Sequence, residues 1–527
     1  MNRNSRIWQW ARFVRDCRTV GPGEAKRRIR EKRETERIRA ELFRGPVLSA
    51  GERKAQEKSV LPRKIRFGIR LLRINADTKT REILMKSLRE QTYTAFTVET
   101  QETDTENDYT VFVEEDGWLH PGALYEIAKT ICETGAELLY TDEDYFSDLP
   151  RGLNHPHCKP GYGPDTMRGC DLCGAFMICS RRLLKEAGAE LYAEMTPEER
   201  WDMAVRMASI ATARAARIER IPKILFYRRA AEGGEIPEPK IKRITDPVEA
   251  VPMVSILIPN KDHQEDLSRC VDSIRKRTTW PGWEIIIVEN NSKEEDTFRY
   301  YKELELDKRI RVIRRSGAFN YSAVNNLGFR EAKGEQILLL NNDTEIISPD
   351  WIQEMLRFAQ RKDVGAVGAK LLYPDGTVQH AGIGFGMKML LGHLHRGWAG
   401  DSNGYFGRLQ YAQDVSAVTG ACMMIPRRVF EEMNGLDESY SVVFNDIDLC
   451  LRIREAGYLI VWTPFAELIH YESKSRGADE DTEEKRRFFV GETNRFLRKW
   501  HKILEEGDPY YNPNLTREKE DFSLRQG

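Results

Sequence analysis

Residues 283–292 read WEIIIVENNS and residues 336–343 read QILLLNND, so each stretch runs from a short apolar block into polar side chains. Apolar blocks of this length alternate with helical stretches in this part of the chain, a pattern that predicts an α/β domain with a mainly parallel sheet. The expected strands are 254–258, 284–288, 311–313 and 336–340, and the expected helices are 265–276, 321–332 and 348–361. Ligands of such sheets bind beyond the carboxyl ends of the strands, so the polar residues after these blocks mark a candidate cleft.

The length and composition of the chain describe a globular protein of several domains. It has 527 residues with 40% hydrophobic and 31% charged residues, and its mean hydropathy is -0.57. These values predict two to four domains and exclude a disordered chain. No apolar run reaches the roughly 18 residues of a membrane helix, which excludes a multi-span membrane protein. The net charge of -1 gives no overall attraction to nucleic acid, so nucleic-acid binding is not expected.

The N-terminal region differs in charge from the rest. Residues 1–66 contain 20 Lys/Arg and 8 Asp/Glu, so this region is basic and the remainder is acidic. Within residues 1–20, apolar side chains fall on one helical stripe with arginines around it, which predicts a short cationic amphipathic helix. Two interpretations stay open: docking to an anionic membrane surface, or packing on the rest of the protein. No secretory signal is recognised, so we expect a cytoplasmic protein, peripheral at the inner face of the membrane if the first interpretation holds, with reduced cysteines.

The two halves of the chain resemble each other. GAFMICSRRLLKEAG, which starts at Gly174, matches GACMMIPRRVFEEMNG, which starts at Gly420, and an aspartate follows each glycine 28 residues later. Upstream, VFVEEDGWLHPGALYEI parallels LLLNNDTEIISPDWIQEM and places Asp116 opposite Asp343. Equal spacing over such distances indicates the duplication of one α/β unit.

Four collinear motifs give the second half a resemblance to a known family. They are SILIPNKDHQEDLSRCVDSI (255–274), WEIIIVENNS (283–292), FNYSAVNNLGFREAKGEQILLLNNDTEII (319–347) and FNDIDLCLRIREAGY (444–458). Together they resemble family 2 glycosyltransferases, which are inverting enzymes of the GT-A fold that use nucleotide sugars. KLLYPDGTVQHAGIGFG and WTPFAELIHYESKSRG are similar to the branch of rhamnosyltransferases and O-antigen or cell-wall polysaccharide enzymes, which often carry tandem domains.

The resemblance and the repeat together imply a domain organisation. A linker is expected at 232–251, where three prolines and two glycines interrupt the pattern. The other segments are a basic helical region at 1–66, a degenerate GT-A-like domain at 67–231, a catalytic GT-A domain at 252–480, and a C-terminal helix and tail at 481–527.

The resemblance also assigns roles to single residues. Asp446 matches the catalytic base, which takes the proton of the acceptor hydroxyl as that oxygen attacks the sugar. Donor binding is implied for Pro259, Glu289, Asn291, Asn325 and Asn342. Metal binding, to Mn²⁺ or Mg²⁺, is implied for Asp343, Asn341 and His470. At two of these positions the chain departs from the family pattern, since Glu289 and Asn341 each stand where the family has Asp.

A glycine-rich stretch, residues 375–407, contains His380, His395 and Arg396 and is expected to form an acceptor or diphosphate loop. In the first copy, Arg200 stands opposite Asp446, and an arginine cannot deprotonate a hydroxyl, so that copy is expected to be inactive. The carboxylates at 114–116 and 142–144 remain there, either as a cation site or as exposed acidic turns.

These features predict transfer of a sugar from a UDP- or dTDP-sugar to a hydroxyl of a cell-surface polysaccharide or lipid-linked glycan. Two alternatives stay open. A sugar nucleotidyltransferase would show the same α/β pattern, although PNKD at 259–262 is not the glycine-rich phosphate loop that is usual in such enzymes. A non-catalytic glycan- or nucleotide-binding scaffold is the other alternative.

Overall fold

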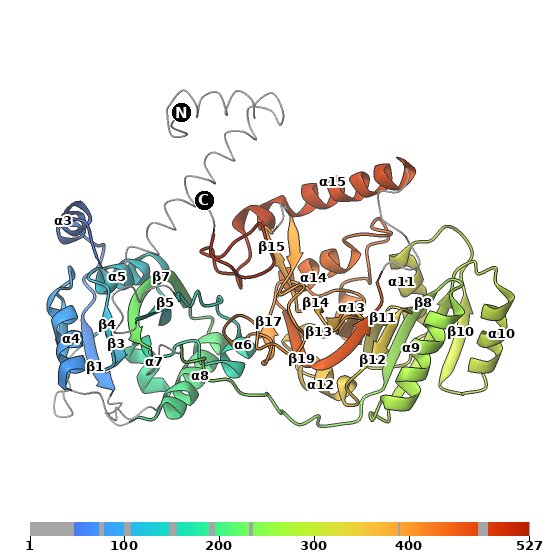
Figure 1. The fold of residues 1–527 in the computed structure, drawn as a ribbon, viewed down its shortest axis with the longest axis horizontal. Coiled ribbons are helices and arrows are strands. Elements are labelled where there is room, and N and C mark those ends of the chain that lie inside the picture. The colour runs from blue at the N-terminus through green and yellow to red at the C-terminus, as the bar shows by residue number, and fades with distance from the viewer. Residues whose placement is uncertain are drawn as a thin grey trace.

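The computed structural model describes residues 47–72, 78–99, 107–146, 155–188, 195–230, 236–387, 390–472 and 483–525. The amphipathic helix expected within residues 1–20 lies outside these ranges. Two α/β bodies stand side by side, each built on its own twisted sheet (Figure 1). None of the helices in the described part of the chain has both the length and the apolar composition for crossing a bilayer.

The first body contains a seven-stranded sheet in the order β2-β1-β3-β6-β5-β7-β4. Its strands are β1 (Phe67–Leu72), β2 (Phe96–Val98), β3 (Tyr109–Glu114), β4 (Gly117–Leu119), β5 (Leu138–Phe146), β6 (Phe176–Ser180) and β7 (Ile218–Arg229). Its helices are α3 (Ala50–Lys58), α4 (Thr78–Arg89), α5 (Ala123–Thr134), α6 (Pro164–Gly169), α7 (Arg181–Glu186) and α8 (Pro197–Ala213).

The second body contains a larger sheet whose main path is β10-β9-β8-β11-β18-β13-β19-β12. The strands are β8 (Val254–Asn260), β9 (Trp283–Glu289), β10 (Ile310–Arg314), β11 (Gln336–Leu340), β12 (Thr344–Ile346), β13 (Val364–Leu372), β14 (Val378–His380), β15 (Ile383–Phe385), β16 (Leu391–His393), β17 (Gln413–Asp414), β18 (Cys422–Pro426) and β19 (Leu459–His470). The helices are α9 (Gln264–Arg277), α10 (Glu295–Leu304), α11 (Tyr321–Glu331), α12 (Trp351–Ala359), α13 (Arg427–Glu432), α14 (Asn445–Glu455) and α15 (Glu483–Glu506).

The two sheets share one strand order. When the first sheet is read from β2 and the second from β9, seven corresponding strands follow each other in the same order. Each neighbouring pair that is parallel in one sheet is parallel in the other, and each antiparallel pair is antiparallel in both. Among the described strands of the first sheet, none corresponds to β10. This shared order is the arrangement that duplication of one α/β unit predicts.

The apolar blocks of the sequence form the centre of the second sheet, which confirms the expected α/β class. Every residue of β8, β9 and β11 is buried, as expected for strands covered by helices on both faces. The pairs β10–β9, β9–β8, β8–β11 and β13–β19 are parallel, and β18 runs antiparallel between β11 and β13. Strand β18 begins at the carboxyl edge of the sheet, where Cys422 pairs with Leu340.

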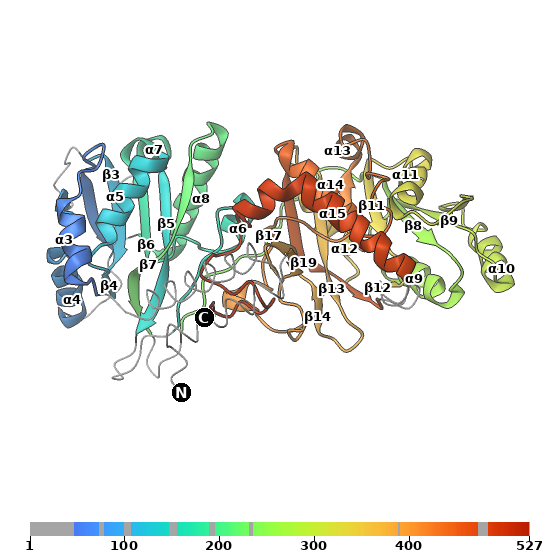
Figure 2. The same ribbon diagram turned by 90° about the horizontal axis from the view of Figure 1, so that it is seen from above.

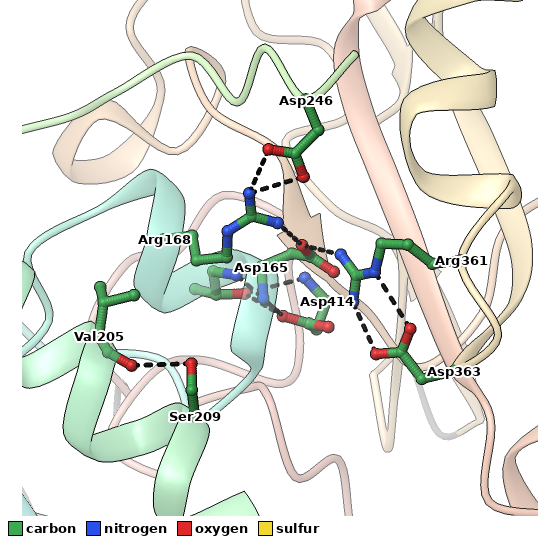
Figure 3. Close-up of polar contacts among 9 residues, drawn as sticks. Asp165, Arg168, Val205, Ser209, Asp246, Arg361, Asp363 and Asp414 are labelled. Atoms are coloured by element: carbon green, nitrogen blue, oxygen red, sulfur yellow. Dashed lines mark hydrogen bonds and ion pairs between the residues drawn. The ribbon is translucent and has the colours of Figure 1, made fainter. Parts of the chain in front are cut away.

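The two bodies are joined by a buried polar contact (Figure 3). Asp414 Oδ2 accepts hydrogen bonds from the backbone N–H groups of Asp165 and Thr166, at 2.8 and 2.9 Å, in the first turn of α6. Arg361 pairs with Asp165, and Arg168 makes a bidentate pair with Asp246 at 2.6 and 2.7 Å. An oxygen of the Asp414 side chain in one domain therefore satisfies backbone N–H groups at the helix terminus of the other, which connects the two domains.

Candidate active site

Polar side chains from three strand ends meet at the carboxyl edge of the second sheet. Asn260 pairs with Glu289 across the ends of β8 and β9, and Asn342 follows β11. The Asn342 amide donates to Asn260 Oδ1 at 2.6 Å, and the Asn260 amide donates to the hydroxyl of Tyr301 at 2.7 Å. These contacts connect all three strand ends, as expected for residues that face one ligand.

The loops after β8 and β9 carry strained backbone. Asp262, His263 and Asn291 have positive φ angles of 54, 51 and 62°, a left-handed conformation that is uncommon for residues other than glycine. Asp262 Oδ1 accepts hydrogen bonds from the backbone N–H groups at 293 and 294, which ties the two loops together. Such strain is typical of functional sites that the surrounding structure holds in shape.

The other residues expected to bind the donor lie in or near these loops. Pro259 is buried near the end of β8, beyond the residues that pair with β11, so its missing N–H leaves that ladder intact. Glu289 is buried, and its Oε1 accepts from the Ser292 N–H at 2.5 Å. Asn291 is exposed and donates to the Gly317 carbonyl. Asn325 differs from these, because it is fully buried in α11 and its amide donates to the Tyr321 carbonyl.

His470 lies beside the two candidate metal ligands that follow β11. Strand β19 pairs with β12 so that His470 lies opposite Thr344. His470 Nε2 is 3.2 Å from Asp343 Oδ1 and 3.3 Å from Asn341 Nδ2. On the other side of the ring, Nδ1 is 2.7 Å from the side-chain oxygen of Gln379, whose own amide donates to Glu472. Because Gln379 presents its oxygen, we place the ring proton on Nδ1 and the free lone pair of Nε2 toward Asp343.

The donor set at this corner fits a divalent cation. A carboxylate and an imidazole nitrogen are ligand types that Mn²⁺ accepts, and a hydrogen bond from the far ring nitrogen is the usual way a ligating histidine is oriented. Asn341 turns its amide nitrogen toward His470, so its amide would have to rotate to offer the oxygen as a third ligand. Across the described ranges, no group of three or more His, Cys, Asp or Glu side chains is arranged to hold a metal ion.

Asp446 lies at the start of α14, as its second residue. Its Oδ2 accepts from the Gly420 N–H at 2.9 Å and its Oδ1 from the Ile447 N–H at 2.8 Å, and the carboxylate is half-buried. Phe444, just before the helix, has a left-handed backbone with φ of 62°. A Cβ on Gly420 would lie 2.9 Å from the Tyr321 hydroxyl and 3.5 Å from the Asp446 Cβ, so the surroundings of this carboxylate are tightly filled.

Helix α15 supports the segment that carries Asp446 from behind. Asp448 pairs with Arg452, one helical turn further on, at 2.8 Å. Asp448 also binds the Trp500 indole at 2.9 Å and Lys499 at 2.7 Å, both from α15. Glu492 of the same helix was not anticipated from the sequence. It lies on one helical stripe with the buried Phe496 and Trp500, and a carboxylate within an apolar stripe is the signal that could have identified it.

The glycine-rich loop separates into two environments. His380 is fully buried, and its Nδ1 lies 3.0 Å from Nδ1 of His393. Burial lowers the pKa of His393 and Arg396 lowers it further, while the nearby carboxylate of Asp446 opposes this shift. His395 is instead packed in a different cluster, where its ring stacks on Phe522 at 4.1 Å. Arg396 is exposed and donates to the Tyr373 hydroxyl at 2.9 Å.

In the first domain, ion pairs fill the corresponding site. Arg228 pairs with Gly117 in the register in which His470 pairs with Thr344, so Arg228 takes the place of that histidine. Glu114, in the place of Asn341, lies 2.8 Å from Arg200 and 2.9 Å from Arg228. Burial raises the pKa of Asp116 to about 6, partly offset by Arg228. The guanidinium groups thus supply the positive charge that these buried carboxylates need.

The other acidic cluster of the first domain is not exposed. Asp142, Glu143 and Asp144 are all buried in β5, so the alternative of an exposed turn is wrong. Their charges are satisfied internally: Glu143 pairs with Lys159 at 3.1 Å, and Asp142 accepts hydrogen bonds from the amides of two asparagines near the end of the chain. The asparagine partners of Asp142 lie 370 and 372 residues further along the chain, so the local sequence does not reveal them.

Comparison with known proteins confirms the resemblance seen in the motifs. Residues 255–433 match the family model described as glycosyl transferase family 2. The chain is 38% identical over 453 residues to an uncharacterized protein, y4gI, of Sinorhizobium fredii, covering 79% of this chain and 49% of that protein. It is 34% identical over 456 residues to the O-antigen biosynthesis protein RfbC of Myxococcus xanthus, covering 80% of this chain and 34% of that protein.

A shorter match extends over 151 residues at 30% identity to the N-acetylglucosaminyl-diphospho-decaprenol L-rhamnosyltransferase of Mycobacterium tuberculosis, covering 27% of this chain and 49% of that protein. The chain therefore spans half or less of the length of each of these relatives.

Proposed function

Because residues 255–433 form a family 2 glycosyltransferase domain, we propose that the protein transfers a sugar from a nucleoside-diphosphate sugar to a hydroxyl of a growing glycan, with inversion at the anomeric carbon. The observation that carries this proposal is the arrangement at the carboxyl edge of the second sheet. There, Asp343 and His470 meet just after the end of β11. Asp446, at the start of α14, accepts a hydrogen bond from Gly420, two residues before β18 begins opposite the end of β11.

Asp343, Asn341 and His470 would hold a Mn²⁺ or Mg²⁺ ion. Bound there, the ion would supply positive charge that stabilises the leaving diphosphate. Asp343 contributes the negative charge, and His470 contributes a ring nitrogen oriented by Gln379. The amide at Asn341 gives one charge less than a second carboxylate would, so the affinity for the ion is expected to be modest.

Asp446 acts as the general base. Its carboxylate takes the proton of the acceptor hydroxyl while that oxygen forms a bond to the anomeric carbon and the bond from that carbon to the diphosphate breaks. The hydrogen bonds from Gly420 and Ile447 hold the carboxylate in one orientation. No covalent sugar–enzyme bond is needed, because a single displacement inverts the centre.

The strand ends of β8, β9 and β11 bind the nucleotide. Glu289, Asn291 and Asn342 offer acceptors and donors for the base and ribose, beside Pro259. We propose a UDP- or dTDP-sugar as the donor. The named roles of the relatives, in O-antigen biosynthesis and in rhamnosyl transfer to a lipid-linked sugar, support a cell-surface polysaccharide or lipid-linked glycan as the acceptor.

The first domain is proposed to be a degenerate GT-A-like copy without transferase activity. Its sheet has the strand order of the second, yet arginines stand where the second has Asp446 and His470. We further propose a cytoplasmic location with residues 1–20 in contact with the inner face of the membrane. Binding of anionic and neutral vesicles by the full chain and by a variant lacking residues 1–20 tests that contact.

Calorimetry with UDP, dTDP and GDP, each with and without Mn²⁺, tests the proposed function. We expect one nucleotide to bind in a Mn²⁺-dependent manner and its affinity to fall in Asp343→Asn. The matched control is Asp116→Asn, the same substitution at the corresponding position of the first domain, and it should leave nucleotide binding unchanged. Absence of nucleotide binding by the folded wild type would overturn the proposal and favour a scaffold.

A further inference from the structure

We propose that the first domain holds the glycine-rich loop of the second domain, residues 375–407, in position for the acceptor. We call this segment the acceptor loop, and the first domain acts on it through the tail segment, residues 507–525. This inference rests on the proposed function, because it assigns a role in that reaction to the loop that contains His393. It is carried by a continuous set of contacts that runs from a buried carboxylate of the first domain, through the tail segment, to the backbone of that loop.

The tail segment is anchored in the first domain through buried asparagines. The Asn512 amide lies 3.0 and 2.9 Å from the two oxygens of Asp142 and also donates to the Lys159 carbonyl at 2.9 Å. The Asn514 amide donates to Asp142 at 3.1 Å and to the Pro222 carbonyl at 3.0 Å. Asp142 and Asn512 are both fully buried, so this is a built contact inside the protein.

The backbone of the tail segment also fits closely against the first domain. A Cβ on Gly161 would lie 1.9 Å from the Pro509 carbonyl oxygen, so only glycine allows the tail to approach this closely. Leu515 is fully buried in a small cluster with Cys158 of the first domain and Leu394 of the acceptor loop. The tail segment is therefore packed between the two domains, where both ribbon views place it near the middle of the molecule (Figures 1 and 2).

The same segment holds the acceptor loop. Glu520 Oε1 accepts from the His393 N–H at 3.0 Å, and the Glu520 carbonyl accepts from the His395 N–H at 3.1 Å. Phe522 stacks on the ring of His395. Asp508 accepts from the Phe385 N–H at 2.9 Å, at the other end of the loop hairpin. Each of these bonds fixes the backbone of β15 or β16, or of the residues that follow them.

The first domain also touches the loop directly. The Tyr405 hydroxyl donates to the Pro156 carbonyl at 3.0 Å and accepts from the Cys158 N–H at 3.0 Å. The ring of His157 stacks on Phe406 at a centroid distance of 4.0 Å. The loop is thus held on one side by the first domain and on the other by a tail that the first domain anchors.

These contacts determine where His393 lies. His393 Nδ1 lies 3.0 Å from His380 Nδ1, and His380 Nε2 lies 3.5 Å from the backbone nitrogen of Thr419. The next residue, Gly420, donates to Asp446 Oδ2 at 2.9 Å, so the backbone that Glu520 fixes bears a side chain that connects to the proposed base through these contacts. A loop that is held by many hydrogen bonds keeps its side chains in one geometry. A transfer between two substrates requires such a fixed geometry of the groups around the acceptor. The first domain lost its own site and kept its fold, and this role explains why the fold is needed.

Asn512→Asp tests the proposal with almost no change of shape. It places a second carboxylate against buried Asp142, and the repulsion between the two groups weakens the contact of the tail segment with the first domain. We expect faster hydrogen–deuterium exchange of the backbone amides in 383–408, a kcat lower by about ten- to a hundredfold or a higher acceptor KM, and unchanged Mn²⁺-dependent nucleotide affinity. The matched control is Asn494→Asp, the same substitution at an exposed position of α15, which should change none of these quantities.

The double variant Asp142→Asn with Asn512→Asp restores an amide–carboxylate pair with its members exchanged. Recovery of loop protection and of part of the turnover supports positioning through this contact. Unchanged exchange in 383–408, or turnover equal to wild type once exchange has risen, would overturn the proposal. The exchange measurement does not depend on activity, so a failure of the proposed function, which appears as a wild type without nucleotide binding, is distinguishable from a failure of this inference.

Discussion

Replacing Glu492 by glutamine tests whether α15 holds the helix of the proposed base in place. Glu492 is buried, and its Oε1 accepts from the Ser441 N–H at 2.6 Å and from the Ser441 hydroxyl at 2.8 Å. Its Oε2 accepts from the N–H groups of Val442 and Val443 at 3.3 and 2.8 Å. This segment leads directly into α14 and Asp446. Glutamine has the same shape but one acceptor oxygen, so one pair of donors loses its partner.

The expected loss of stability follows from counting the hydrogen-bond donors that face residue 492. The amide fits best with its oxygen toward the two valines and its NH₂ toward the Ser441 hydroxyl, which leaves the Ser441 N–H unsatisfied. A buried donor without a partner costs about 1–3 kcal/mol, and the remaining bonds lose their charge assistance. We therefore expect the free energy of unfolding to fall by about 2–3 kcal/mol, which lowers the Tm by about 4–12 °C for a domain of this size.

The kinetic effect distinguishes positioning from simple stability. At a temperature where the variant is folded, we expect kcat to fall by about tenfold or more, equivalent to about 1.4 kcal/mol, with the donor KM unchanged. Differential scanning fluorimetry and initial-rate kinetics on wild type and Glu492→Gln measure both quantities, with Asn494→Asp on the same helix as the control. A lower Tm with wild-type kcat would refute the claim that this contact positions Asp446.

Three further substitutions have defined outcomes. Arg200→Ala removes one of the buried cationic partners of Glu114. Thermal scans should show the first domain destabilised by about 3–5 kcal/mol, and nucleotide binding should not change. Unchanged stability would contradict the buried ion pair. Burial and the adjacent Asp165 raise the pKa of Asp414, so the folded state keeps a proton on this side chain that the unfolded chain releases above about pH 4. The free energy of unfolding should therefore decline as the pH rises from there. Denaturant titrations of Asp414→Asn should show a smaller decline. Gly420→Ala should lower kcat by pressing on the Tyr321 hydroxyl, and the added change Tyr321→Phe should restore part of it, whereas equal rates in both variants would argue against this contact.

The local features of the second domain could be predicted from its sequence, because they depend on neighbours in the chain. Apolar runs predict β8, β9 and β11, and the polar residues after them predict the edge where Asp343 and Asn342 lie. The Asp448–Arg452 pair follows from a helical spacing of four residues. Each of these patterns is complete within one element or within one strand and its following turn.

The remaining features depend on contacts between distant parts of the chain. The acidic run at 142–144 has the composition of an exposed turn, but Asp142 is buried, and its partner Asn512 lies 370 residues away. Glu492 resembles one more charge on a polar helix until its partners at 441–443 are known. The antiparallel direction of β18 is set by its pairing with β11 and β13, which no periodicity of its own sequence encodes. Local pattern does not contain such information, since either partner alone has an ordinary environment.

The central claim is that Asp446 is the base of an inverting sugar transfer, and the rate of transfer by Asp446→Asn tests it most directly. Asparagine keeps the shape and the hydrogen bond from Gly420 but is not able to take the acceptor proton. Measured with the nucleotide sugar whose nucleotide binds in the presence of Mn²⁺, kcat should fall by about 10²- to 10⁴-fold while nucleotide affinity stays at the wild-type value. A variant that transfers sugar within about threefold of the wild-type rate, far less than the loss of a general base causes, would contradict the account.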